Sequence, residues 1–292
     1  TFFKEKIQDV LSRSFERDIT IGEMEGSLLS LIVAKNVVLF NREGYSQDIF
    51  ATVEQMNIYT SFRVVFGGLL SAILKVDFDQ VVLNIERNAN KQVNILEFSK
   101  LGKATGGAGF EGKLTFYGIS GQYVDGNSVG TEGFRQAFYR GDAVISFNKG
   151  TGISIDASML LEDTQAVSRF NGEFLFKERE FQYSFSLDAV DASLWGDYLV
   201  PGQFFKFGPQ FVLIEGKLLS EYTNANQRPV FKYDIDFFFN DLQLMYSKWS
   251  VPVEQIRGVV GVTNLEGEPQ LLVENVHGVV SGHDVQAVGT VL

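Results

Sequence analysis

The chain has 292 residues, 36 of them acidic and 25 basic, so that its formal net charge is −11; 45% of the residues are hydrophobic. A sizeable core is therefore available and a wholly disordered chain is excluded, while the negative charge argues against binding of nucleic acid and broad docking on anionic lipid headgroups. The absence of cysteine excludes disulfides, thiolate zinc sites and thiol catalysis. With only two histidines as well, we expect no enzyme, no metal site and no cofactor.

Phenylalanine dominates the aromatic residues, with 27 copies against 10 tyrosines and 2 tryptophans. Its ring carries no polar group. The chain must therefore hide a large apolar surface, either against itself or against an apolar ligand.

The N-terminal segment is predicted to form one amphipathic helix over residues 2–17. Its apolar residues recur at helical spacing, with charged and polar residues between them: Phe3, Ile7, Val10, Leu11 and Phe15. No segment reaches the roughly 18–20 apolar residues that a membrane-spanning helix needs, and the best candidate, residues 64–74, is bounded by Arg63 and Lys75.

Further along the chain, strict alternation of apolar and polar residues predicts antiparallel strands with one apolar and one wet face. It is clearest over residues 81–85, 153–159, 181–187 and 231–239. In the last of these segments, Phe238 interrupts the polar side. We expect turns at four short segments, namely Asp125-Gly126-Asn127, Asn171-Gly172, Glu266-Gly267 and Ser281-Gly282. The chain is thus predicted to be mainly β.

Two short helices are also predicted, over Leu69–Leu74 and over residues 190–200. The glycine-rich segment from Lys103 to Gly109 is typical of a flexible loop. We place a soft domain boundary there, between a helix-plus-β region at 1–104 and an extended β region at 105–292.

Motifs that carry chemistry are weak. Gly126-Asn127-Ser128-Val129-Gly130 has the spacing of a hydrolase nucleophile elbow, but the strand–turn–helix context is missing. The glycines at 106–109 lack the Gly-Lys-Ser/Thr of a phosphate-binding loop. His277 and His283 would share a face if their segment were one straight strand, yet a metal needs more ligands than two. Asp234 and Asp236 are interpreted as a solvated strand face.

The apolar strand faces give the strongest signal, and they permit two interpretations. Two sheets could bury each other in a closed core, or the faces could line a groove that holds lipid. Composition does not separate the two, although a phenylalanine-rich lining favours acyl chains. As candidate lipid-binding residues we take Val81, Leu83, Ile85, Phe181, Tyr183, Phe185, Leu187, Phe231, Tyr233, Ile235, Phe237 and Phe239.

Both ends of the chain carry further patterns. After the N-terminal helix come a run from Ile19 to Leu29, a strand at Val37–Phe40, a strand at 49–59, and Val81–Ile85 followed by Asn94-Ile95-Leu96. At the other end stand Val253–Val262, Leu271–Val276 and the glycine-punctuated run from Gly278 to Val291. These regions resemble the start and the repeat of the AsmA/TamB-like proteins of the double-membrane bacterial envelope. The middle, roughly residues 105–250, matches only in its β alternation.

The resemblance implies a long, curved antiparallel sheet with an open apolar groove, a β-taco. It implies a protein that carries phospholipid acyl chains between the inner and outer membranes, with both membranes and an outer-membrane assembly protein as partners. It also implies a periplasmic location, with an inner-membrane anchor in a segment upstream of Thr1. The alternative function is a non-enzymatic β scaffold for outer-membrane protein assembly or protein docking.

Overall fold

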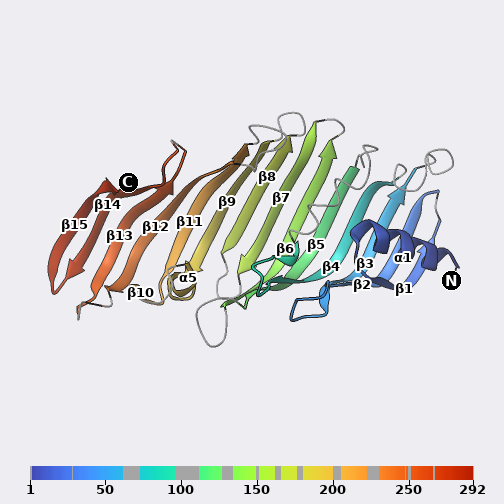
Figure 1. Cartoon of the computed structure of the whole chain (residues 1–292), viewed down its shortest axis with the longest axis horizontal. Helices are drawn as coiled ribbons and strands as arrows, with labels where there is room; N and C mark the ends of the chain where they lie inside the picture. The colour runs from blue at the N-terminus through green and yellow to red at the C-terminus, as the bar shows by residue number, and fades with distance from the viewer. Residues whose placement is uncertain are drawn as a thin grey trace. The chain divides into compact units, whose positions relative to one another are not determined.

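The chain is mainly β, as expected, and its elements are drawn in Figure 1. The computed structural model describes residues 2–27, 29–61, 73–95, 112–126, 134–148, 151–161, 166–175, 180–199, 205–221, 230–246, 248, 251–265 and 267–291. It divides into two compact units, unit 1 at Thr1–Glu162 and unit 2 at Asp163–Leu292. The boundary expected at residue 104 lies outside the described residues and stays a prediction.

Within its described residues, unit 1 has one helix and seven strands, and each strand pairs with the next along the chain. The elements are α1 (Phe2–Phe15), β1 (Ile19–Gly26), β2 (Leu31–Phe40), β3 (Ile49–Thr60), β4 (Ile73–Arg87), β5 (Gly112–Asp125), β6 (Phe134–Asn148) and β7 (Gly152–Leu161). Of the helix expected at Leu69–Leu74, the last two residues belong to β4 and the rest lies outside the described residues.

One pairing in unit 1 corrects the expectation of a purely antiparallel sheet. β4 and β5 run parallel, with Val76 opposite Leu114 and Ile85 opposite Tyr123. The connection from Asn88 to Glu111 is long enough to return the chain to the starting end of β4, which a parallel pair requires. The sheet is therefore mixed. Alternation in the sequence cannot show this, because both kinds of strand have a side-chain period of two.

Helix α1 lies across β1–β3 (Figure 1), packs on apolar side chains of β1–β4 and also bonds the outer edge of β1. Ile7 is 4% exposed and packs in a cluster with Ile21, Ile32 and Met56. Polar side chains on a second side of the helix form hydrogen bonds with the backbone of β1. The Ile19 and Ile21 N–H groups donate to Ser12 Oγ (3.1 Å) and Gln8 Oε1 (3.3 Å), and Lys4 Nζ donates to the Gly22 carbonyl (2.9 Å). These bonds satisfy edge groups that would otherwise be open to another strand.

A row of left-handed residues crosses the strands of unit 1 and resets their alternation. In β2, Ala34 and Val37 are three residues apart and should face opposite sides, yet both belong to the same core cluster. Asn36 between them has φ of 54°, and its neighbours along the row include Gln80 in β4 (φ 53°) and Gly118 in β5 (φ 64°). Each turns its strand so that the apolar side chains before and after it stay on one face.

Unit 2 is an antiparallel sheet with a short helix. The strands follow the order β8 (Val167–Leu175), β9 (Glu180–Asp191), β11 (Phe211–Glu221), β12 (Val230–Tyr246), β13 (Val253–Thr263), β14 (Gln270–Val280) and β15 (His283–Val291), and β10 (Phe205–Phe207) pairs with β12. Helix α5 (Ala192–Leu199) confirms the helix expected within residues 190–200. No helix among the described residues is long and apolar enough to cross a membrane.

The turn predictions are partly confirmed. Ser281 and Gly282 form the turn between β14 and β15, and Gly126 follows the end of β5. The turn expected at Asn171-Gly172 is wrong, because both residues lie inside β8. Glycine serves another purpose there, since the Tyr183 ring of the neighbouring strand lies over Gly172.

We expect Gly121→Ala to destabilise unit 1 by about 1–3 kcal/mol, because a Cβ at this position would run into the Leu83 carbonyl of β4 and force the parallel strands apart. Gly126→Ala is the matched control, since no atom lies within 4 Å of its Cβ position. Urea unfolding of both variants tests this. Equal midpoints would contradict the close approach of β4 and β5.

Candidate functional site

The register of unit 2 places the predicted lining residues on one face of its sheet. Leu218 of β11 lies opposite Tyr183 of β9 and Tyr233 of β12, and Ile214 lies opposite Leu187 and Phe237. Cross-strand partners share a face. Nine predicted residues therefore form one surface, which we call the apolar face: Phe181, Tyr183, Phe185, Leu187, Phe231, Tyr233, Ile235, Phe237 and Phe239.

The apolar face extends beyond the residues found from the sequence. β8 adds Phe170, opposite Phe185, and Phe174, opposite Phe181. On the other side, β13 and β14 add two opposed pairs, Val260 with Val273 and Val262 with Leu271. Because Asn171-Gly172 was predicted to be a turn, Phe170 and Phe174 were not predicted as lining residues. Phe170 and Phe174 are four residues apart, and Gly172 stands at the alternate position between them, so the apolar alternation is interrupted in the sequence.

Aromatic rings form a ladder at the centre of this face. Along β9, the centroids of Phe181 and Tyr183 are 6.0 Å apart with an interplanar angle of 13°, and those of Tyr183 and Phe185 are 6.1 Å apart. Phe170 stacks on Tyr183 from β8, at 6.1 Å. Gly216 lies beneath the Phe185 ring, since a Cβ there would come within 2.6 Å of its Cζ atom. Glycine thus lets the ring cover the neighbouring strand.

Burial differs along the apolar face. Most of its side chains, including Tyr183, Phe185, Ile235 and Phe237, are half-buried. Burial raises the pKa of the Tyr183 hydroxyl far above its usual range, so this ring stays neutral. The face is therefore apolar and uncharged, and it retains surface that a ligand can cover.

The three predicted residues of β4 lie in unit 1. Val81, Leu83 and Ile85 alternate with the strand's other side chains and share one face. Val81 is only 2% exposed, and its pairing partner Val53 packs against the α1 core cluster. Its packing is that of a core residue, whereas Leu83 and Ile85 are half-buried. A lipid-binding role for these three residues stays a prediction.

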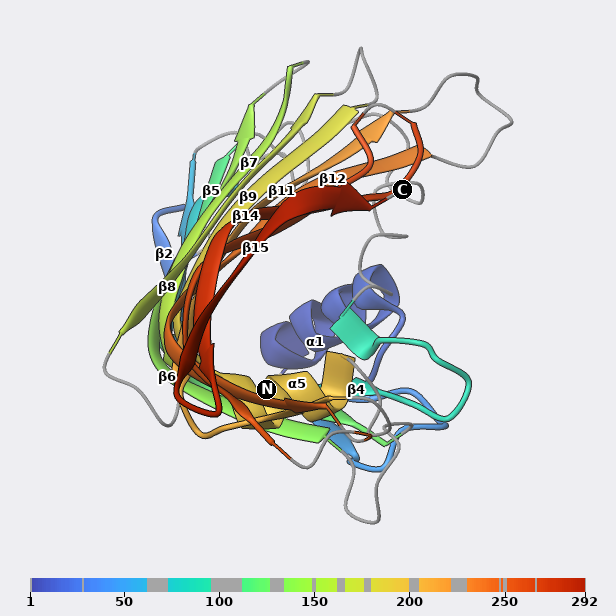
Figure 2. The same ribbon diagram turned by 90° about the vertical axis from the view of Figure 1, so that its left-hand side faces the viewer.

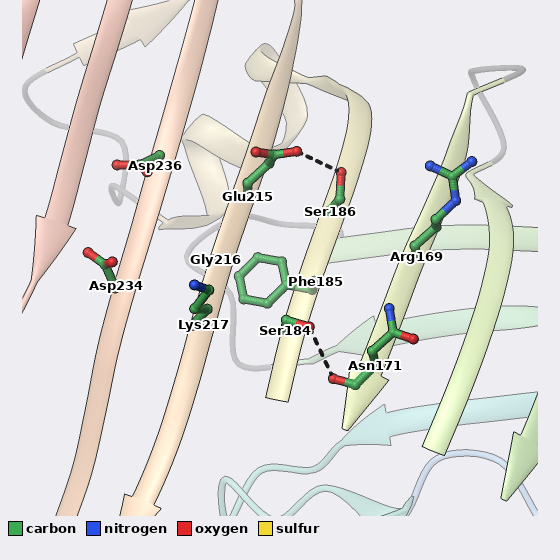
Figure 3. A pocket seen from close by; sticks show the side chains of 10 residues that line it. All are labelled: Arg169, Asn171, Ser184, Phe185, Ser186, Glu215, Gly216, Lys217, Asp234 and Asp236. Atoms are coloured by element: carbon green, nitrogen blue, oxygen red, sulfur yellow. Dashed lines mark hydrogen bonds between the residues drawn. The ribbon is translucent and has the colours of Figure 1, made fainter. Parts of the chain in front are cut away.

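The opposite face of the unit 2 sheet is polar (Figure 3). A shallow hollow of about 410 Å³ there is lined by Arg169, Asn171, Ser184, Phe185, Ser186, Glu215, Gly216, Lys217, Asp234 and Asp236. Its two serine hydrogen bonds are long, from Ser184 Oγ to the Asn171 carbonyl (3.5 Å) and from Ser186 Oγ to Glu215 Oε1 (3.4 Å). Among the described residues, their partners are a backbone carbonyl and a carboxylate rather than a histidine.

Asp236 is the electrostatically strained group of this polar face. Partial burial and the nearby carboxylates of Asp234, Glu274 and Glu215 raise its pKa above the usual aspartate value. Phe238, the residue that interrupts the polar alternation, lies opposite Leu213 and Val259. It therefore belongs to a small apolar patch on the polar face.

The remaining motifs do not assemble into a catalytic or metal site within the described part of the chain. His277 lies opposite Gln286, whereas His283 lies opposite Val280 after the turn, so the two exposed histidines are on different faces. The condition of one straight strand is not met, because the predicted Ser281-Gly282 turn separates the two histidines. No group of three or more metal-binding side chains occurs among the described residues. Residues 127–130 and 103–109, which carry the serine and glycine motifs, lie outside them.

Comparisons with known proteins add no assignment. No model of a known protein family matches the chain, and a search of curated proteins finds no relative. Functional inference therefore rests on the faces of the sheet.

We expect Asp236→Asn to stabilise the protein at pH 7 by roughly 0.3 kcal/mol, because it removes repulsion from the carboxylates of Asp234, Glu274 and Glu215. The raised pKa means that the folded chain favours protonated Asp236, so the wild type loses this stability as pH rises. The gain should vanish below about pH 4, where the aspartate is protonated in the unfolded chain too. Urea unfolding at pH 3 and pH 7 measures it, with Asp284→Asn on exposed β15 as the control. A pH-independent gain would contradict the electrostatic cause.

Proposed function

We propose that this chain binds and carries lipid acyl chains on the apolar face of unit 2. The observation that carries the proposal is the half-buried aromatic and aliphatic surface that the register of β8–β14 builds on one side of the sheet. Acyl chains are the ligand that such a surface fits, because it offers contact area without charge.

The energetics favour this ligand. Each acyl CH₂ removed from water contributes about 0.8 kcal/mol, and the rings of Phe181, Tyr183 and Phe185 provide a continuous contact surface along β9. Transfer of a lipid along such a face needs no catalytic group. The charged headgroup can stay in water while the chains lie on the sheet.

The resemblance to AsmA/TamB-like proteins supports the setting of the proposed activity. We propose that the lipid is phospholipid, that the chain acts in the periplasm between inner and outer membranes, and that its partners are those two membranes and an outer-membrane assembly protein.

A single introduced charge tests the proposal. Phe237→Glu should remove co-purifying lipid, with at least a tenfold loss of affinity, because a carboxylate on the apolar face would be desolvated by a bound chain. Phe238→Glu is the matched control: it is the next residue, equally half-buried, and lies on the opposite face. Native mass spectrometry of protein purified without detergent, with organic extraction of bound lipid, gives the readout.

The outcome depends on the contrast between the two variants. Lipid bound at fixed stoichiometry to the wild type and to Phe238→Glu, but not to folded Phe237→Glu, supports the proposal. A lipid-free wild type that takes up none from phosphatidylcholine vesicles, or equal lipid in both variants, would contradict it.

The exposure of β15 favours the second candidate function, a scaffold that docks proteins. Every residue of β15 is exposed, including Val285, Val288 and Val291. Exposed strands of this kind pair readily with strands of other proteins. Val288→Lys should then abolish protein docking and leave lipid content unchanged, which separates the scaffold from the lipid carrier.

A further inference from the structure

The apolar face is closed at one end of its strands and exposed at the other. Near the ends of β9 and β12, Val190 is 0% exposed and Leu242 2% exposed. At the opposite end of the strands, Phe231 is 63%, Leu271 38% and Val291 59% exposed. Phe231 belongs to the apolar face, and Leu271 and Val291 continue it.

Left-handed bulges keep the buried end on the same face. Ala189 (φ 52°) and Asp241 (φ 71°) each add a residue to their strand. Val190 therefore returns to the side of Leu187, and Leu242 to the side of Phe239. The face is continuous from its exposed end to its closed end.

Helix α5 stands at the closed end, where it contacts β9 and β10 (Figure 2). Asp191 caps it: Asp191 Oδ1 accepts from the Ser193 and Leu194 N–H groups, at 2.8 and 3.2 Å. At mid-helix, Gly196 lets the Phe207 ring of β10 pack directly on the backbone, since a Cβ would run into that ring. Phe207 in turn pairs with Leu244 of β12. The helix is thus held at its N-terminus by Asp191 of β9 and at its middle by Phe207 of β10.

We propose that α5 is an end wall that orients the bound acyl chain and limits its length. This inference rests on the proposed function. The chain lies with its methyl end against α5 and its polar headgroup at the Phe231 end. The reverse orientation would bury the headgroup beside Val190 and Leu242, where it would lose its water without gaining a polar partner from these side chains. At the exposed end the headgroup keeps its water.

The orientation is testable without disturbing the wall, because α5 carries Trp195. In a Trp249→Phe variant, Trp195 is the only tryptophan left. Phosphatidylcholine brominated near the methyl end of its chains should quench its fluorescence, and the same lipid brominated near the carbonyl should not. Equal quenching, or stronger quenching by the carbonyl-proximal bromines, would overturn the orientation.

The length limit is tested by a series of fatty acids of increasing chain length. Affinity for the wild type should rise about fourfold for each added methylene and stop rising when the chain reaches α5. In Phe207→Ala, which removes a ring from the wall, the rise should continue to longer chains. Phe211→Ala is the matched control, because Phe211 precedes the buried Val212 and points to the opposite face.

The two proposals fail in different ways. The end wall would be overturned, and lipid binding would stand, if the wild type binds the fatty acids and its affinity stops rising at the same chain length as that of Phe207→Ala. Circular dichroism must show that the variant is folded. A wild type that binds none of the fatty acids and shows no quenching would overturn both. An unfolded Phe207→Ala leaves the decision to the bromine experiment.

Discussion

The structure depends on one constraint, the two-residue period of side chains along a strand and the points where that period is reset. A strand that alternates strictly keeps its apolar residues on one side only while it runs regularly. The strands here are long, up to 17 residues in β12, and they contain left-handed residues that each shift the alternation by one. Asn36 keeps Ala34 and Val37 together in unit 1, and Asp241 keeps Phe239 and Leu242 together in unit 2. Without these resets, each apolar face would end halfway along the strands.

The two units cover their apolar faces differently. In unit 1, α1 covers the apolar side of β1–β4 with Ile7 and bonds the β1 edge through Gln8 and Ser12. In unit 2, α5 covers one end only, and residues such as Tyr233, Ile235 and Phe237 stay half-buried. A helix on the face therefore produces an ordinary core in one unit. In unit 2 the helix is shorter, and the apolar surface on which the lipid proposal depends stays partly exposed.

Glycine and aromatic residues together shape that surface. Gly216 and Gly172 carry no side chain, and the rings of Phe185 and Tyr183 occupy the space above them. The result is a smooth ladder rather than separate side chains standing on the sheet. Such a surface gives dispersion contact along its length, which suits a flexible chain better than a compact polar ligand.

The sequence by itself determined the helices α1 and α5, the strands at 81–85, 153–159, 181–187 and 231–239, and which lining residues within each strand lie on the same side. These features are local: helical spacing and two-residue alternation are set by backbone geometry within one element. Only the tertiary structure decided that β4 and β5 are parallel, that Asn171-Gly172 lies within a strand, and that Val81 is core. Each of these depends on which strand or helix lies alongside, and the period of one strand contains no information about its neighbour. Burial at Val190 and exposure at Phe231 likewise depend on what lies against each end of the strands, since both residues are apolar.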